Sequence, residues 1–384
     1  MKAPLHLNPV KKIRSKAGLI FALVLITAAT ITSCKKDAAT KDVQSITAAR
    51  NGNSPDITVH SGESIQSAVN AASDGFVIRI EAGTYKEAIL VDKPGIQLLG
   101  SGNVIIENPG DEEDGIKVTD NGDGFVLKNV TIQNFEENGV FMIRVDNFLL
   151  SHVTTINNGE YGLFPLFCSN GTIEHCSATG HSDTGIYVGQ STNVVMEHNV
   201  AYANVNGLEI ENCSNVTVSK NKAYDNVCGI LAVLLPGLTT KASSNILISD
   251  NHINDNNHIN FGDPDEGFEA LIPSGSGILI VGTDQTTVDH NKISGNNFVG
   301  VAVVSSVILG ALAGLPPEAF ADIEPNPDGT KVINNVLEAN GTVQPAGIPL
   351  PAVDLLWDGS SPLTNCWSNN HFTTSFPSPL PACN

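Results

Sequence analysis

The sequence repeats one short pattern at near-constant intervals: DGIKV (114–118), NGVFMI (138–143), YGLFPL (161–166), TGIYVG (184–189), NGLEIE (206–211) and CGILAV (228–233). Successive glycines, from Gly115 to Gly229, are 24, 23, 23, 22 and 22 residues apart. Apolar residues follow each glycine at its first and third positions, as Ile186 and Val188 follow Gly185. A fixed period of this length is typical of a stacked repeat, and alternating apolar residues in short runs are typical of β-strands.

Asparagines recur at three fixed distances after the glycines. They stand at the eighth, fourteenth and nineteenth positions, as Asn193, Asn199 and Asn204 do after Gly185, and His181 takes the nineteenth position of one coil. Asparagine tolerates left-handed backbone, and its amide can bond to a stacked neighbour. The pattern predicts an all-β fold, a single right-handed parallel β-helix with three short strands in each coil of 22–24 residues.

The N-terminus predicts export and lipidation. Residues 1–33 carry five basic residues, no acid and a short apolar run, which is the pattern of a signal peptide. An uncleaved membrane helix is disfavoured, because about 13 apolar residues are short for a span. The run ends in Ile31-Thr32-Ser33-Cys34, which resembles a bacterial lipobox and implies lipidation of Cys34. By the same resemblance, Lys35 implies an outer-membrane lipoprotein, either periplasmic or surface-exposed, and residues 34–55 are expected to form a flexible tether.

The charge balance limits the partners. Asp and Glu number 40 against 20 Lys and Arg, which gives a formal net charge of −20. Nucleic acid and anionic lipid surfaces are excluded as partners, and membrane contact is expected only through the lipid anchor. A polysaccharide or oligosaccharide is the expected partner, and the chain is expected to be a monomer. No cofactor is required by the sequence, and calcium is the candidate if one is bound.

The β-helix is expected to span residues 56–341. Ser64 and the apolar face of Ile65, Ala68, Val69 and Ala72 predict a short helix that covers the open N-terminal end. The segment from this helix to Ile89 resembles the first coil of pectin-lyase-like β-helix proteins. Insertions at 234–244, 258–276 and 306–328 are expected to flank one sheet face and form groove walls, unless they merely collect where insertions are tolerated. Residues 342–384 are interpreted as a C-terminal cap and tail.

The cysteines divide into two groups. Cys168 and Cys213 share a column but lie two coils apart, roughly 9.6 Å at about 4.8 Å per strand, which is beyond disulfide reach. They are expected to be buried thiols. Cys366 and Cys383 lie outside the repeat and are expected to pair in an oxidising compartment, with two free thiols as the alternative.

Strand alternation places the second and fourth residues after each glycine on the outer face. Neighbouring coils then bring together four candidate catalytic residues, Asp183, Tyr187, Glu209 and Glu211, and four candidate ligand-binding residues, Phe141, Phe164, Glu160 and Gln190. Exposed aromatic rings beside carboxylates suit sugar stacking. Crowded carboxylates raise one another's pKa, which permits general acid catalysis or a Ca²⁺ site. A solvated acidic face under a loop is the alternative.

A histidine column offers a second candidate site. His152, His175 and His198 occupy the same position in three consecutive coils, each on an outward corner. Stacked imidazoles could share a transition metal, although Lys128 and Lys220 in the same column favour an ordinary polar corner.

The runs YGLFP (161–165), SDTGIYVGQS (182–191) and NGLEIEN (206–212) resemble a family of exported bacterial right-handed β-helix repeat lipoproteins. This resemblance implies fold and location more than activity. Alginate C5-epimerases share the architecture, but Phe164-Pro165-Leu166 lacks the acid and histidine that they carry around a proline, and the paired Asp motifs of polygalacturonases are also missing. Arg144 is the only arginine after Arg79, which leaves one candidate for a pectate-lyase-like base.

Three hypotheses follow for this chain. The first is an envelope protein that binds or processes polysaccharide; if it is an enzyme, it would be a lyase or glycoside-active enzyme. The second is a non-enzymatic envelope scaffold whose groove binds a partner protein. The third is a periplasmic metal-handling protein resembling the nitrous-oxide-reductase accessory type, which the three methionines of the chain disfavour.

Overall fold

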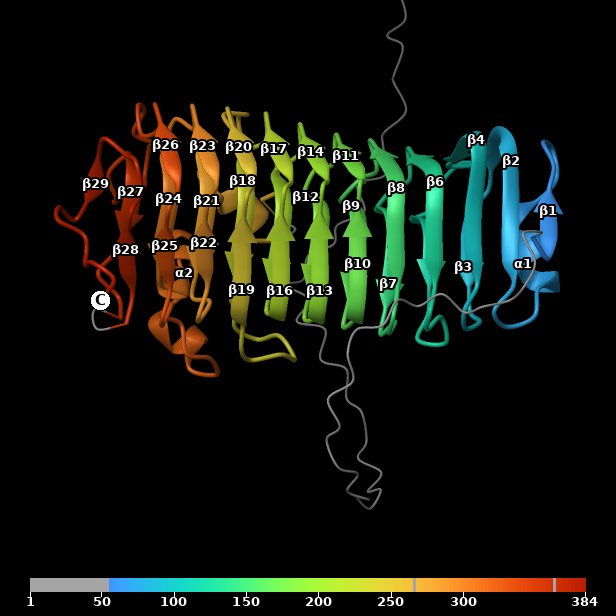
Figure 1. The fold of residues 1–384 in the computed structure, drawn as a ribbon, viewed down its shortest axis with the longest axis horizontal. Helices are drawn as coiled ribbons and strands as arrows, with labels where there is room; N and C mark the ends of the chain where they lie inside the picture. Colours follow the sequence, from blue (N-terminus) through green and yellow to red (C-terminus); the bar gives the residue numbers. More distant parts are fainter. Residues whose placement is uncertain (1–54, 265–266, 362–363) are drawn as a thin grey trace, which may run out of the picture. The chain divides into compact units, whose positions relative to one another are not determined.

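A computed structural model describes residues 55–264, 267–361 and 364–384. Over these residues the chain forms the predicted right-handed parallel β-helix, and its coils stack side by side along one axis (Figure 1). The signal peptide, Cys34 and the tether lie outside the described residues, except for residue 55. No helix among the described residues is long and apolar enough to cross a membrane.

Each coil contributes a strand with the repeated glycine to one sheet, here called the glycine sheet, whose eleven strands are all paired in parallel with their neighbours. Its strands are β3 (Ile89–Val91), β5 (Asp114–Val118), β7 (Asn138–Ile143), β9 (Tyr161–Leu166), β12 (Thr184–Gly189), β15 (Asn206–Glu211), β18 (Cys228–Val233), β21 (Ser276–Val281), β24 (Val299–Val304), β27 (Val353–Trp357) and β29 (Ser375–Phe376).

The other two strands of each coil form two further parallel ladders. The second ladder holds β10 (Ser169–Glu174), β13 (Thr192–Glu197), β16 (Ser214–Ser219), β19 (Ser244–Ser249), β22 (Thr287–Asp289), β25 (Lys331–Ile333) and β28 (Cys366–Ser368). The third holds β11 (Ser177–Thr179), β14 (Val200–Tyr202), β17 (Lys222–Tyr224), β20 (His252–Asn254), β23 (Lys292–Ser294) and β26 (Val336–Glu338). In the first coils the two ladders are continuous, in β2 (Val77–Lys86), β4 (Gln97–Glu107), β6 (Val126–Gln133) and β8 (Leu149–Ile156).

Two of the asparagine columns are buried hydrogen-bond ladders. In one, Asn204 Nδ2 donates to Asn226 Oδ1 at 3.1 Å, and Asn226 Nδ2 donates to Asn256 Oδ1 at 2.9 Å. This ladder explains the repeated glycine, because a Cβ on Gly185 would lie 2.7 Å from Asn204 Nδ2 and a Cβ on Gly229 2.9 Å from Asn256 Nδ2. The glycine is therefore fixed by contact with the buried amide of its own coil.

The N-terminal end is closed as the sequence predicts. The helix α1 (Ile65–Ala71) follows β1 (Ile57–Val59), and the Ser64 hydroxyl accepts a hydrogen bond from Ser67 N at 3.0 Å. Burial of Ile65, Ala68 and Val69 covers the apolar end of the coil stack.

The C-terminal boundary of the prediction was wrong. Strands β27, β28 and β29 pair in parallel with β24, β25 and β27, so the β-helix continues beyond residue 341. The period was hidden because residues 341–352 leave the coil before β27 begins. The predicted disulfide between Cys366 and Cys383 is present, with 4.8 Å between the Cα atoms, and it lies in this last part of the β-helix. Cys168, Cys176, Cys213 and Cys228 are free and buried.

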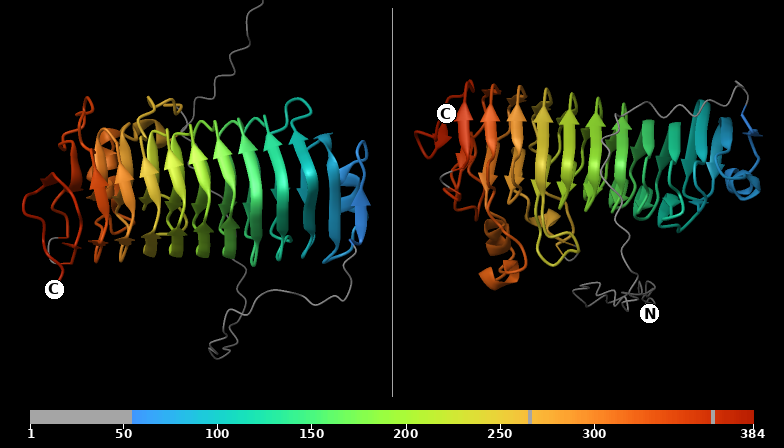
Figure 2. Two further views of the ribbon diagram at one scale, coloured as in Figure 1. Left: turned by 45° about the horizontal axis from the view of Figure 1, so that its top comes forward. Right: turned by 60° about the horizontal axis from the view of Figure 1, so that its bottom comes forward.

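Three excursions leave the coils near the predicted positions, between β18 and β19, between β20 and β21, and between β24 and β25. The second contains the 3-10 helix η1 (Glu269–Leu271), and the third contains α2 (Ser306–Leu312) and η2 (Pro317–Phe320). Asp322 accepts hydrogen bonds from Gly237 N and Lys241 Nζ, which ties the first excursion to the third. Figure 2 shows α2 and the first excursion projecting on the same side of the coil stack.

Candidate functional site

The outer face of the glycine sheet changes character along its length. On β5, β7 and β9 it carries the half-buried side chains of Lys117, Phe141 and Phe164. The rings of Phe141, Tyr161 and Phe164, here called the aromatic strip, lie in contact, with centroids 5.3 Å apart for Phe141 and Phe164 and 4.3 Å for Tyr161 and Phe164. Lys117 Nζ lies 5.0 Å from the centre of the Phe141 ring.

From β15 onward the same face is covered. The excursions pack Leu235, Ile272 and Leu309 onto outward side chains of the sheet such as Leu231 and Leu279, and together they form a second apolar cluster outside the coils. The expectation of a freely exposed outer face is therefore wrong here: Tyr187 is 4% and Glu209 7% exposed. Alternation along the strand correctly predicted that these side chains leave the coil, but not that they are buried. The excursions cover Glu209, while the rings of Tyr161 and Phe164 pack on Tyr187.

A cavity of about 180 Å³ lies where the covering segments begin. Three of the four candidate catalytic residues, Asp183, Glu209 and Glu211, line its polar side. The remaining lining comes from the sheet and the excursions: Tyr161, Asn206, Leu231, Val233, Leu235, Gly267, Phe268, Glu269, Ile272 and Leu309. Acidic residues from two neighbouring coils therefore line one cavity, and residues of the excursions complete its lining.

Glu209 is held by donors from two neighbouring strands. Its Oε2 accepts from the Thr184 hydroxyl at 2.5 Å and from Asn206 Nδ2 at 3.1 Å. The pKa of Glu209 is raised well above its usual range, first by burial, then by the charges of Asp183 and Glu211. The sequence predicted repulsion between the carboxylates as the cause of the raised pKa. In the structure this repulsion is the second cause and burial is the first, because the excursions remove water from the carboxyl group.

Tyr187 lies directly beside Glu209 in the pairing of β12 with β15. Its hydroxyl donates to Glu211 Oε1 at 2.7 Å, so it holds one wall of the cavity without lining it. Burial raises the pKa of Glu211 to about 7, although the bond from Tyr187 opposes this shift. The Tyr187 ring folds over Gly189, where a Cβ would lie 2.1 Å from the Tyr187 hydroxyl.

Two lining residues that were not predicted, Tyr161 and Asn206, are hydrogen-bonded to the cavity carboxyl groups. Tyr161 is hydrogen-bonded to Asp183, and burial raises its pKa well above the usual value, with the nearby charge of Asp183 as the next cause. Asn206 is 1% exposed and uses Nδ2 to hold Glu209, while its Oδ1 has no hydrogen-bond partner among the described residues. A buried acceptor without a donor is costly, so Asn206 is held at this position against a penalty.

A bend of the chain at Gly207 explains why alternation in the sequence did not identify Asn206 as a site residue. Strict alternation from Leu208 would turn the residue before Gly207 into the coil. The Gly207 Cβ position itself points at core atoms, 3.1 Å from Ala223 Cβ, while Thr184 and Asn206 reach outward to Glu209. The signal that could have found them is a polar residue directly before the glycine, as in TGIYVG and NGLEIE.

The candidate ligand-binding residues do not line the cavity. Phe141 and Phe164 belong to the aromatic strip beside it, and the backbone oxygen of Glu160, one coil before Asp183, accepts from Asp183 N at 3.1 Å. Gln190 Oε1 accepts from Thr240 N at 2.9 Å, so this side chain anchors the first excursion. Of the eight candidates, three line the cavity and Tyr187 supports its wall. Phe141 and Phe164 are neighbouring rings, Gln190 anchors the first excursion, and Glu160 contacts Asp183 through its backbone.

The histidine column forms a stack of exposed rings. Centroids lie 4.9 Å apart for His152 and His175 and 4.9 Å for His175 and His198. All three residues have positive φ, between 53° and 57°, which places them at the left-handed corner after a strand. The three rings do not form a cluster compatible with one metal ion among the described residues.

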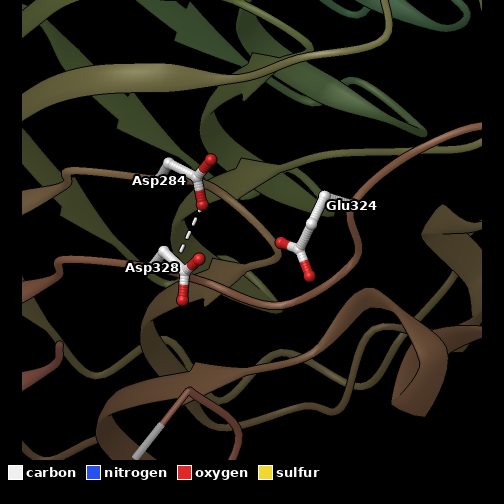
Figure 3. A group of neighbouring side chains, drawn as sticks. All are labelled: Asp284, Glu324 and Asp328. Carbon is white, nitrogen blue, oxygen red and sulfur yellow. Dashed lines mark hydrogen bonds between the residues drawn. The ribbon is translucent and has the colours of Figure 1, made fainter. Parts of the chain in front are cut away.

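One group of carboxylates among the described residues has the spacing of a metal site. Oxygens of Asp284, Glu324 and Asp328 all lie within 4.8 Å of one another, between the third excursion and the turn after β21 (Figure 3). Asp328 N donates to Asp284 Oδ1 at 2.9 Å, and burial raises the pKa of Asp284. The group lies outside the cavity, so calcium as a cofactor stays a prediction.

The cavity provides the groups needed for proton transfer. The raised pKa of Glu209 favours its protonated form, in which it can donate a proton, and Glu211, with a pKa of about 7, exchanges a proton near neutral pH. Apolar lining residues from the excursions, such as Ile272 and Leu309, limit the access of water, which strengthens electrostatic interactions inside.

Comparisons with known proteins agree with this architecture. A family model described as "Right handed beta helix region" matches residues 88–234 and 234–308. No curated protein sequence gave a significant match to the chain.

Solved structures with the same fold include two modules from Azotobacter vinelandii. They are the A-module of mannuronan C-5 epimerase AlgE4 (TM-score 0.56, 16% identity, 80% of this chain and 90% of that chain) and that of AlgE6 (TM-score 0.54, 16% identity, 81% and 91%). A third is the DFA-IIIase of Arthrobacter chlorophenolicus A6 in complex with GF2, without its lid (TM-score 0.50, 13% identity, 78% and 87%).

Proposed function

Since this chain belongs to the right-handed beta helix family, we propose that it binds or processes a polysaccharide or oligosaccharide on the outer face of the glycine sheet. The observation that carries the proposal is the placement of the aromatic strip beside the cavity that Asp183, Glu209 and Glu211 line. The fold neighbours named above include mannuronan epimerase modules, which is consistent with a carbohydrate ligand.

The two parts of the site suit different parts of one ligand. Half-buried rings such as Phe164 offer a flat apolar surface to the C–H face of a sugar ring. The cavity offers carboxyl groups to its hydroxyl groups. An extended chain would therefore lie along the sheet from β5 to β12 with one unit in the cavity.

Processing would depend on proton transfer by the carboxyl residues. Glu209 would act as the general acid and donate its proton to the oxygen of the leaving group. Glu211, with its pKa of about 7, would act as the general base and accept a proton from the substrate or from water. Tyr187 is a positioning residue in this scheme, because its hydroxyl holds Glu211 at 2.7 Å.

We also propose that the protein is a lipoprotein of the outer membrane, anchored through Cys34. This part rests on the sequence of residues 1–34 alone. Metabolic labelling with a fatty-acid analogue tests it, and labelling that persists in Cys34→Ser would contradict it.

A glycan array followed by calorimetry on the full chain tests the carbohydrate proposal. Phe164→Ala should weaken binding of an identified glycan about tenfold, equivalent to about 1.4 kcal/mol, because a stacking surface is lost. Tyr224→Ala is the matched control, since Tyr224 stacks on Tyr202 on a different sheet, with centroids 5.2 Å apart.

Glu209→Gln separates binding from processing, because the amide keeps the shape but cannot donate the acidic proton. It should abolish the formation of new reducing ends or unsaturated products and leave binding within a few fold. An array without any glycan ligand would sink the proposal.

A further inference from the structure

We propose that the cavity binds a protonated amine on a single sugar unit, so that its ligand is an amino sugar and not a uronate. This inference rests on the proposed function and names the substrate class for the same site.

The charges around the cavity have one sign. Among the residues that the structure describes, its lining includes the acids Asp183, Glu209, Glu211 and Glu269, and no Lys, Arg or His. Lys117 is paired with Asp114 at 3.0 Å, and Lys241 is paired with Asp322 in the first excursion. A uronate carboxylate would enter a buried acidic site without a compensating cation, which is strongly unfavourable, whereas an ammonium group would find its counter-charge there.

The unused hydrogen-bonding capacity agrees with a donor-rich ligand. The Asn206 amide group donates to Glu209 and to the Thr184 oxygen, and the Thr184 hydroxyl has Glu209 and Asp183 as acceptors, so these donors are already used inside the site. An ammonium group offers three donors and no acceptor, so it can bond to the cavity carboxylates without adding an unpaired acceptor.

The size and the apolar wall indicate one sugar unit. A volume of about 180 Å³ equals about six water molecules at roughly 30 Å³ each, which suits one small ring. Leu231 lies beside Glu209 on the sheet, and Ile272 and Leu309 come from the excursions, so part of the ring would contact apolar carbon. Further units of a chain would extend onto the aromatic strip.

A divalent cation is a poorer occupant. Calcium holds its oxygens at about 2.3–2.6 Å, so two of its ligands are at most about 5 Å apart. Among the described residues, the only three carboxylates within such a distance of one another are Asp284, Glu324 and Asp328, outside the cavity.

Calorimetry of the full chain with three trisaccharides tests the inference: β-linked glucosamine, its fully N-acetylated form, and mannuronate. The glucosamine trisaccharide should bind at least tenfold more tightly than the N-acetylated one, and the mannuronate should show no binding. Equal or tighter binding of either of the other two would overturn the inference while the proposed function stands. If none of the three trisaccharides binds and the glycan array shows no ligand, both the inference and the proposed function are wrong.

Variants locate the effect in the cavity. Glu211→Gln should weaken glucosamine binding at least tenfold and leave N-acetylated binding within threefold, and Glu174→Gln on the second ladder is the matched acidic control. If Glu211→Gln lowers the melting temperature, Glu269→Gln on the covering excursion replaces it. Unchanged glucosamine binding in the folded variant would place the amine elsewhere and overturn the inference.

Discussion

His181 occupies a position at which neighbouring coils carry a buried asparagine. It is fully buried, its Nδ1 donates to the Asn158 carbonyl oxygen at 3.1 Å, and its Nε2 lies 3.2 Å from the Thr155 hydroxyl. Burial lowers the pKa of His181 to about 4. A neutral imidazole thus substitutes for the amide, one ring nitrogen donating and the other accepting.

This substitution predicts a pH dependence of stability. In the unfolded chain His181 takes up a proton near pH 6.5, but in the folded chain only near pH 4, so stability is lost as the pH falls between these values. The loss from this residue is about 3 kcal/mol. His181→Asn should remove it, which urea unfolding at pH 7 and pH 4.5 measures as a smaller difference between the two pH values.

Asn204→His is the reciprocal control, because it places an imidazole in the next coil and should add a similar pH dependence. Identical pH profiles for His181→Asn and the unmodified chain would show that the ring is not held neutral by burial.

At the scale of elements, the excursions create a second apolar cluster that the coils alone lack. Leu309 of α2 is 7% exposed, packs in this cluster and also lines the cavity. The helix is only seven residues long, so its own hydrogen bonds contribute little and its position depends on such contacts. The element that covers the site is thus held by a few apolar side chains.

Leu309→Ala should destabilise this covering by about 2–3 kcal/mol, because a buried leucine loses its side chain. Hydrogen exchange in α2 should become faster, while exchange in β7 and β9, far along the stack, should not change. Val343→Ala, at a side chain that is 54% exposed and lies outside the three excursions, is the control for the loss of an apolar side chain. Equal acceleration in β7 would contradict a local role for α2.

Each described coil is expected to be stabilised mainly by its contacts with the coils directly before and after it. Each strand pairs only with the strands before and after it in its ladder, so a local defect should remain near its own coil. The Cys366–Cys383 disulfide ties the segment after the last strand to β28 and closes the end of the stack.

Cys383→Ser should therefore loosen the last coil. A bridge over 17 residues contributes about 3 kcal/mol, and its removal should increase exchange in β27, β28 and β29. Protection of β12 and β15 should be unchanged, and reduction of the unmodified protein should give the same pattern. A uniform loss of protection in all coils would mean that the stack unfolds as one unit.

The sequence by itself determined the fold, because the 22–24-residue period, the alternating apolar residues and the buried asparagine columns are local requirements of every coil. It also brought Tyr187 beside Glu209 and predicted the capping helix. Only the tertiary structure decided which outward residues face a cavity: the excursions bury Glu209, and the bend at Gly207 turns Asn206 outward. These features depend on contacts between segments that share no period, so no repeat in the sequence encodes them.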